Sequence, residues 1–421
     1  MTDWTQMTLA SFQLSLSRGE LSPLDWWRAC RERITAVEPT LQAWEFLAPE
    51  PTITEHDSRQ PRSALCGVPV GIKDIIDTTR MPTTWGTQGY HRVNGADMDA
   101  AIVTQLTRLG GLPMGKTVST EYAYFQPSKT RNPHDPTRTP GGSSSGSAAA
   151  VATGMVPVAL GTQTVGSIIR PASYCGVVGF KPTHGTLSVA GVKALAPSLD
   201  TLGWFTRHME DTRTLFTILT GSEPITVSTR LDGVRVGLCR VPSDPPPSLE
   251  TIAALETAAA RMAALGAELN PIDLGASFDA LVSHQKVILA YEATRALTSE
   301  RDRFEPSMSP ALISLLDEGR NLSLAQYWQS QQAAECSRST LSQYFAEHFD
   351  ILLSPSAPGV APQGLASTGD PVYSRAWTML GVPCINLPLH WTPQGLPVGI
   401  QLIADRYQDQ QLLSIASALM P

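Results

Sequence analysis

Apolar and polar residues alternate with two different periods along the chain, and these periods predict a succession of strands and helices. Short apolar runs rich in valine, isoleucine and leucine indicate buried strands at residues 67–77, 156–161, 350–355, 383–388 and 398–403. Apolar side chains at helical spacing predict helices at residues 7–37, 97–110, 147–152, 280–348 and 409–419.

Residues 233–273 combine both patterns, because a strand-like run, a long alanine-rich helical run and a second strand-like run follow one another. Such a unit predicts a parallel crossover. The polar, proline-interrupted stretch at 45–64 predicts a surface connection. No repeat and no break in composition divides the chain. We therefore expect a single α/β domain over residues 1–421, with a central mixed, mostly parallel β-sheet covered by helices on both faces.

Composition narrows the class of protein. A chain of 421 residues is long enough for two or three average domains or for one large one. Its hydrophobic content of 42% is ordinary for a globular protein, and its net charge of -7 argues against binding of nucleic acid or of an anionic membrane surface. No apolar run approaches the ~20 residues of a membrane span, and the N-terminus lacks a signal-peptide pattern, so we expect a cytoplasmic protein.

The metal-binding residue types are scattered. Six cysteines form no CxxC pair, and eight histidines form no recognisable catalytic or metal motif. We therefore expect reduced thiols, no metal and no other cofactor.

A glycine- and serine-rich stretch, residues 140–147, runs directly into the alanine-rich segment 148–152. A flexible linker is one interpretation of such a composition. The other is an active-site loop, because a glycine-rich turn that enters a helix brings backbone N–H groups and hydroxyls to one point. The apolar segments on both sides favour the active-site loop.

Two further residues are candidates for chemistry. Ser167 follows a predicted strand and precedes a predicted helix, which is a suitable position for a nucleophile and equally for a helix N-cap. Lys73 lies in an apolar strand-like run, where it either pairs with Asp74 or Asp77 or loses its proton and acts as a base.

The segment Gly110–Thr117 matches the phosphate-loop pattern GxxxxGKT, with Lys116 as its lysine. A phosphate loop requires a strand before it and a helix after it, whereas here a predicted helix precedes and a strand-like run follows. The context therefore argues against a nucleotide site.

Three of these features together resemble the amidase signature family. They are Gly67–Asp74, the run Gly141–Ala150 and Ser167, with Ser143 lying 70 residues after Lys73 and 24 before Ser167. The likeness covers nearly the whole chain, with a core at 65–210, and also includes residues 176–183, 198–203 and 395–401. The runs 161–164, 169–171 and 365–371 are similar to malonamidase-type members, which hydrolyse short amides bearing a carboxylate.

The resemblance implies a catalytic role for each residue. Ser167 matches the nucleophile, Ser143 matches a bridging serine preceded by a cis peptide bond, and Lys73 matches the terminal base, which must be neutral to accept a proton. The backbone N–H groups that match the oxyanion hole belong to Thr164, Val165, Gly166 and Ser167.

Two positions depart from the usual pattern of the family. Val165 stands where glycine is common. A β-branched residue resists a positive φ, so the oxyanion hole would be distorted if this position required one. We expect an active enzyme with a narrowed pocket. Trp204 stands where proline is common, and we interpret it as packing. Arg170 matches an arginine that binds the substrate carboxylate, while the alternative is a structural arginine paired with an acidic residue.

The resemblance implies an amide hydrolase that forms an acyl-enzyme on a small, carboxylate-bearing amide, with no metal or cofactor. Neutral aliphatic or aryl amides and ureido compounds are alternative substrates. A further alternative is a subunit of an amidotransferase, and a homodimer is common among relatives.

Overall fold

A mixed β-sheet of eleven strands runs through this computed structural model, which describes residues 3–51, 63–87, 95–239 and 245–420. The strands lie in the order β1-β3-β2-β4-β6-β5-β10-β11-β9-β7-β8. Their bounds are β1 Trp44–Leu47, β2 Pro69–Lys73, β3 Leu112–Thr117, β4 Val158–Gln163, β5 Val178–Lys181, β6 Thr201–Thr206, β7 Arg235–Cys239, β8 Glu268–Ile272, β9 Ile351–Pro355, β10 Cys384–Trp391 and β11 Pro397–Ile403.

The predicted single-domain α/β fold with a mixed sheet is confirmed, but the prediction that the sheet is mostly parallel is wrong. Among the described strands, six of the ten neighbouring pairs are antiparallel. The connection from β10 to β11 spans only residues 392–396, which is too short for a parallel crossover. The predicted strand–helix–strand unit at 233–273 does pair β7 with β8 in parallel.

Most of the helices fall in the predicted stretches, but α7, α9 and α14 lie outside them. Their bounds are α1 Leu9–Ser17, α2 Asp25–Leu41, α4 Ala101–Arg108, α5 Ser145–Ala152, α6 Ile169–Cys175, α7 Met209–Thr220, α8 Leu249–Ala264, α9 Ala276–Asp279, α10 Leu281–Ala296, α11 Thr298–Phe304, α12 Pro310–Asn321, α13 Leu324–Glu347, α14 Val372–Leu380 and α15 Asp409–Leu419. The surface connection predicted at 45–64 is wrong in its first residues, because 44–47 form β1; residues 52–62 of it lie outside the described part.

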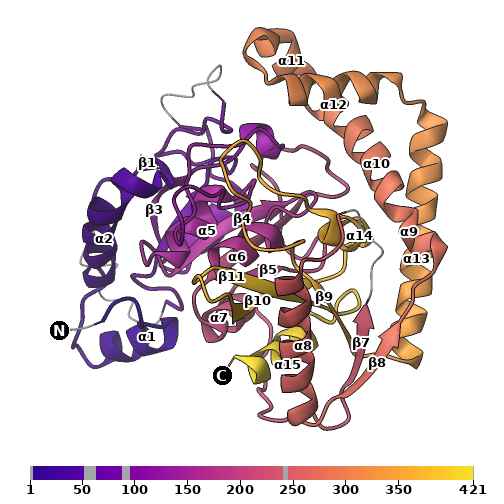
Figure 1. Ribbon diagram of the computed structural model, residues 1–421. Helices are drawn as coiled ribbons and strands as arrows, with labels where there is room; N and C mark the ends of the chain where they lie inside the picture. Colours follow the sequence, from indigo (N-terminus) through magenta and orange to yellow (C-terminus); the bar gives the residue numbers. More distant parts are fainter. Residues whose placement is uncertain (1–2, 52–62, 88–94, 240–244, 421) are drawn as a thin grey trace.

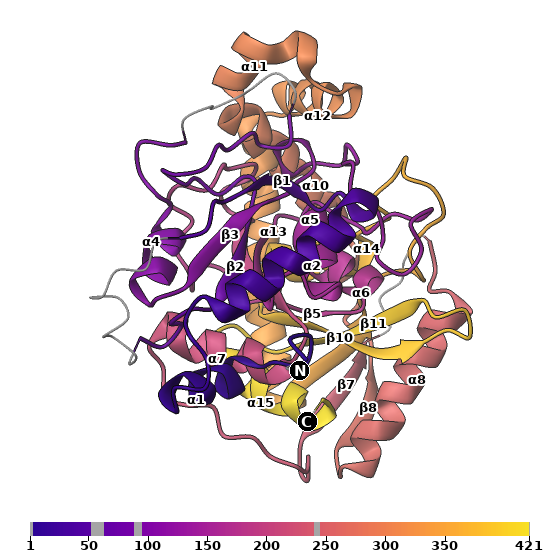
Figure 2. The ribbon, with the colours of Figure 1, turned by 90° about the vertical axis from the view of Figure 1, so that its left-hand side faces the viewer.

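Helices cover both faces of the sheet, as predicted. Successive residues of a strand point to opposite faces, and on β5 a Cβ placed on Gly179 would lie 2.5 Å from Ala172 of α6, while Phe180 packs edge-on against Phe216 of α7. Helix α6 therefore covers one face and α7 the other. Helix α2 crosses in front of β2 and β3 in Figure 2.

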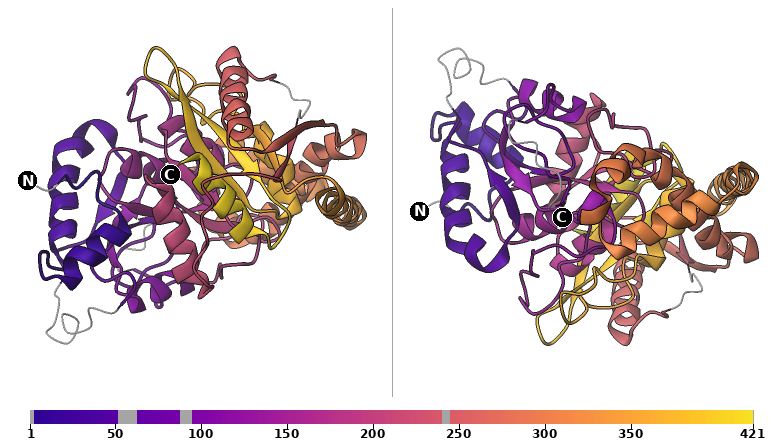
Figure 3. Two further views of the ribbon diagram at one scale, coloured as in Figure 1. Left: turned by 90° about the horizontal axis from the view of Figure 1, so that it is seen from below. Right: turned by 90° about the horizontal axis from the view of Figure 1, so that it is seen from above.

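A separate group of helices, α10 to α13, gathers on one side of the sheet (Figures 1 and 3). Helix α10 packs against α12, α13 and α14, and a second buried apolar cluster joins this group to the sheet. Helix α14 thereby connects the outer helices with the centre of the molecule. No helix in the described ranges has both the length and the apolar content needed to cross a membrane.

Candidate active site

The glycine- and serine-rich stretch forms a buried loop and the start of a helix. Ser143 is 2% exposed, and Ser144, Ser145 and Ser147 are fully buried. Ser145 begins α5, and its side chain donates a hydrogen bond to the carbonyl oxygen of Gly141 at 2.9 Å. The flexible-linker interpretation is therefore wrong.

Lys73, at the end of β2, points into this loop from a fully buried position. Its Nζ lies 2.7 Å from Ser143 Oγ and 2.7 Å from Thr162 Oγ1. Burial lowers the pKa of Lys73 well below its ordinary value, and the more distant carboxylate of Asp200 opposes this only in part. Lys73 forms no ion pair with a described carboxylate, because its sequence neighbour Asp74 faces Lys116.

The loop is fixed from two directions through its backbone. The peptide bond between Gly142 and Ser143 is cis, as the resemblance implied. The carbonyl oxygen of Gly142 accepts a hydrogen bond from Arg170 Nη2 at 2.6 Å, and that of Ser143 accepts one from the Thr120 N–H at 3.1 Å. The Ser143 side chain is thus held against Lys73.

Ser167 lies between β4 and α6 with 6% of its surface exposed. Its hydroxyl makes no hydrogen bond to any residue that the structure describes. The N-cap interpretation of Ser167 is wrong, because Ile168 occupies the cap position and the N–H groups of Ile168 and Ile169 donate to Gln163 Oε1 at 2.9 and 3.1 Å. The Ser167 hydroxyl is therefore available for chemistry.

The backbone before Ser167 presents unused donors. Within the described ranges, the N–H groups of Thr164, Val165, Gly166 and Ser167 have no hydrogen-bond acceptor. Neither Val165 nor Gly166 has a positive φ, so the valine does not strain the turn. A run of free N–H groups beside a hydroxyl is the arrangement that stabilises an oxyanion.

Three contacts that the sequence analysis missed hold this turn in place. Gln163 Nε2 donates to Thr378 Oγ1 at 2.9 Å, and Thr378 Oγ1 donates to the carbonyl oxygen of Val165 at 2.7 Å. Thr164 Oγ1 donates to Asp200 at 2.5 Å. A Cβ on Gly166 would lie 2.7 Å from Pro371, so glycine is needed for the close approach of α14.

The contacts that Thr162 and Thr378 make differ in how closely the sequence indicates them. The parallel register of β2 and β4 pairs Val70 with Val158 and Gly71 with Ala159, which places Gly161 opposite Lys73 and Thr162 one residue further along. The contact of Thr162 with Lys73 therefore needed the structure. Thr378 lies 215 residues from Gln163, and no local pattern indicates the contact.

Arg170 is buried, at 2% exposure, and is not paired with an acidic residue in the described part of the chain. Besides Gly142, its Nη2 donates to Thr368 Oγ1 at 3.1 Å, while Nε and Nη1 have no acceptor. Burial lowers its pKa to about 10. The alternative that predicted an acidic partner is therefore wrong, and two donors remain unused. Trp204, fully buried and edge-on to Phe180 at 5.1 Å, serves packing as expected.

The phosphate-loop match does not form a phosphate loop. Residues 112–117 are strand β3, and Lys116 is fully buried, with Nζ 2.6 Å from the carbonyl oxygen of Ile76 and 2.7 Å from Thr83 Oγ1. The nucleotide-site alternative is therefore wrong.

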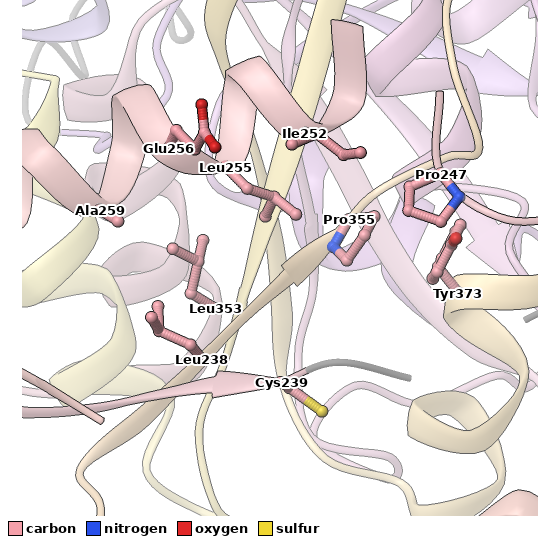
Figure 4. Close-up of a pocket in the computed structure, with 10 residues that line it drawn as sticks. All are labelled: Leu238, Cys239, Pro247, Ile252, Leu255, Glu256, Ala259, Leu353, Pro355 and Tyr373. Carbon is pink, nitrogen blue, oxygen red and sulfur yellow. The ribbon is translucent and has the colours of Figure 1, made fainter. Parts of the chain in front are cut away.

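A cavity of about 410 Å³ lies elsewhere, between α8, β7 and β9 (Figure 4). Its described lining is mainly apolar and contains none of the predicted site residues; Leu238, Leu255 and Leu353 meet there with Cys239 and Tyr373. No group of three or more His, Cys, Asp or Glu side chains in the described ranges is placed to hold a metal ion.

Comparison with known proteins gives a consistent result. The family model described as Amidase matches residues 25–413. A glutamyl-tRNA(Gln) amidotransferase subunit from Roseiflexus castenholzii is 31% identical, over 99% of this chain and 96% of the relative. The crystal structure of an amidase has a TM-score of 0.84 at 27% identity, over 99% of this chain and 100% of the other. The peptide amidase of Stenotrophomonas maltophilia has a TM-score of 0.84 at 26% identity, over 99% and 97%.

Proposed function

This chain belongs to the amidase family and is an amide C–N hydrolase, and on that premise we propose that it hydrolyses a small, carboxylate-bearing amide through Ser167, Ser143 and Lys73. The observation that carries the proposal is the environment of Lys73. A fully buried amine whose described side-chain partners are two hydroxyls is favoured in its neutral form and can accept a proton.

The proton moves along the two serines. Ser167 Oγ attacks the amide carbonyl while its proton passes to Ser143 Oγ and the Ser143 proton passes to Lys73 Nζ. The four N–H groups of residues 164–167 stabilise the oxyanion. As the C–N bond breaks, the proton returns through Ser143 to the leaving amine. Water then hydrolyses the acyl-enzyme by the same relay and releases the carboxylic acid.

The Ser167 hydroxyl has no hydrogen-bond partner in the described residues, and the relay requires it to donate to Ser143 Oγ when the substrate is bound. Catalytic hydrogen bonds are often loose without substrate and tighten in the complex. The two unused donors of Arg170 support a carboxylate on the acyl part, since a guanidinium presents a planar fork to such a group.

Covalent labelling tests the nucleophile. We expect a fluorophosphonate to label the peptide that contains Ser167, and we expect Ser167→Ala to abolish labelling and to lower turnover by about 10⁴–10⁶-fold, as removal of a serine nucleophile does. Ser374→Ala is the matched control, because Ser374 is another buried serine beside the turn whose hydroxyl has no partner in the described residues. Labelling of another serine would contradict the proposal.

A second candidate function is that of the amidase component of an amidotransferase. It is favoured by the 31% identity of this chain to the amidotransferase subunit of Roseiflexus castenholzii. Steady release of ammonia from simple amides by the purified chain alone would oppose it. Release that requires added partner proteins would favour it over the proposal.

A further inference from the structure

Two arginines from different helices lie against the same aromatic ring beside the candidate active site. The guanidinium carbon of Arg170, on α6, is 5.7 Å from the centre of the Phe125 ring, and that of Arg375, on α14, is 5.9 Å from it. The acidic group that acts on both, Asp370, is exposed and forms no ion pair with either. Two cations therefore share one half-buried apolar surface, and neither forms an ion pair with a carboxylate in the described residues.

The donors around this ring are incompletely used. Arg375 Nη1 donates to Gln285 Oε1 at 2.8 Å, and Gln285 is fully buried. Gln285 Nε2 and the Nε and Nη1 groups of Arg170 have no acceptor in the described residues. Buried donors normally have partners, so this surplus of positive charge and N–H groups indicates an anionic ligand.

Both arginines are tied to the catalytic loops. Arg170 lies three residues after Ser167 and donates to the carbonyl oxygen of Gly142. Arg375 follows Ser374, whose hydroxyl would lie 3.3 Å from a Cβ on Gly166. A ligand held by these two arginines is therefore held next to the turn that carries Ser167.

We propose that Arg375 is a specificity-determining residue, which with Arg170 binds the carboxylate of the substrate's acyl part through the two guanidinium groups that lie against Phe125. The proposal rests on the proposed function for its substrate class and adds a residue that the sequence analysis did not single out. Arg170 Nη2 already donates to Gly142 and Thr368, so Arg170 also has a structural role. Arg375 is half-buried and donates to a neutral amide, that of Gln285, so its substitution tests charge recognition more directly.

A pair of substrates that differ in charge tests Arg375. Malonamate carries a carboxylate where propionamide carries a methyl group. We expect Arg375→Gln to lower kcat/KM for malonamate about tenfold or more, mainly through KM, because a charge-assisted contact is lost. For propionamide kcat/KM should change by less than about twofold, and Arg375→Lys should recover part of the malonamate preference because it keeps the charge.

The control is Arg295→Gln, which removes another arginine stacked on an aromatic ring, that of Tyr291, at 3.2 Å. It should leave both substrates unaffected. An equal loss for malonamate and propionamide in Arg375→Gln would overturn the proposal, because it would mean that Arg375 only supports α14.

Binding of malonate by calorimetry separates this proposal from the proposed function. If no amide is hydrolysed in a Ser167-dependent way, the proposed function fails. Malonate should still bind wild type and bind Arg375→Gln about tenfold more weakly. No binding to wild type, or equal affinity for the variant, would overturn the anion site.

Discussion

Strands β2 and β3 are neighbours, each carries a fully buried lysine near its C-terminal end, and the surroundings of the two lysines differ in kind. Lys116 has a carboxylate, with Nζ 3.6 Å from Asp74, together with a carbonyl oxygen and a hydroxyl. Lys73 has two hydroxyls and no ion-pair partner in the described residues. The two side chains have similar burial, so the difference between them is the chemistry of the neighbours.

The pKa values follow these neighbours. Burial lowers the pKa of Lys116 to about 8, and the attraction of Asp74 limits the fall. The pKa of Lys73 falls well below its ordinary value, because only the more distant Asp200 opposes desolvation. A buried lysine is thus structural when a carboxylate accompanies it and suited to act as a base when hydroxyls do.

Removal of the amine of Lys73 should give the largest effect on activity. Lys73→Met keeps the apolar stem and deletes the proton acceptor, so we expect kcat to fall by about 10³–10⁴-fold. Stability should not fall, because no buried charge loses its partner and the folded state no longer has to hold a buried amine in its deprotonated form. Turnover within about threefold of wild type near pH 7 would contradict the role of Lys73.

Removal of the amine of Lys116 should act on stability instead. Lys116→Met leaves Asp74 buried without its cation, and breaking a buried pair from one side costs about 3–5 kcal/mol in the free energy of unfolding. Burial raises the pKa of Asp74 even with Lys116 present, so the folded variant holds the Asp74 proton more tightly than the unfolded chain does. Its stability should therefore fall as pH rises above the ordinary carboxyl range.

Denaturant unfolding at several pH values measures this effect. The double variant Lys116→Met with Asp74→Asn should recover much of the loss, since asparagine retains an acceptor for Thr84 and carries no charge. The folded fraction of each variant should keep kcat within about threefold of wild type. A catalytic loss in Lys116→Met as large as in Lys73→Met would remove the distinction between the two lysines.

Sequence alone singled out Lys73 as a lysine in an apolar strand and argued against a phosphate loop at Lys116, because both depend on local residue types and on motif context. It did not reach their partners. Whether Asp74 faces Lys73 or Lys116 depends on the side to which the chain turns after β2, and this is decided by packing against β3. The antiparallel centre of the sheet was also missed, since β5 and β6 are short strands without clear alternation, and β5 also pairs with β10, about 200 residues further along the chain.

Introducing a carboxylate beside Lys73 should make it resemble Lys116. In wild type the rising limb of kcat/KM against pH should lie well below the ordinary pKa of lysine, because the neutral amine is the active form and burial lowers its pKa. In Thr162→Asp the new carboxylate favours the charged amine, so the limb should move to higher pH by about one unit or more. At a pH below both limbs, the activity of Thr162→Asp should be about tenfold lower than that of wild type for each pH unit by which the limb has moved.

The matched control is Thr162→Asn, which has nearly the same shape and still offers an oxygen to Lys73. It should lower activity by a similar factor at all pH values and leave the limb where it is, because a neutral amide has no net charge to attract the ammonium. The two variants are therefore compared by the pH at which the limb lies, which a general loss of rate from altered packing does not change. If Thr162→Asp and Thr162→Asn show the same limb, the titrating group in catalysis is not Lys73, and the contrast between the two lysines describes stability alone.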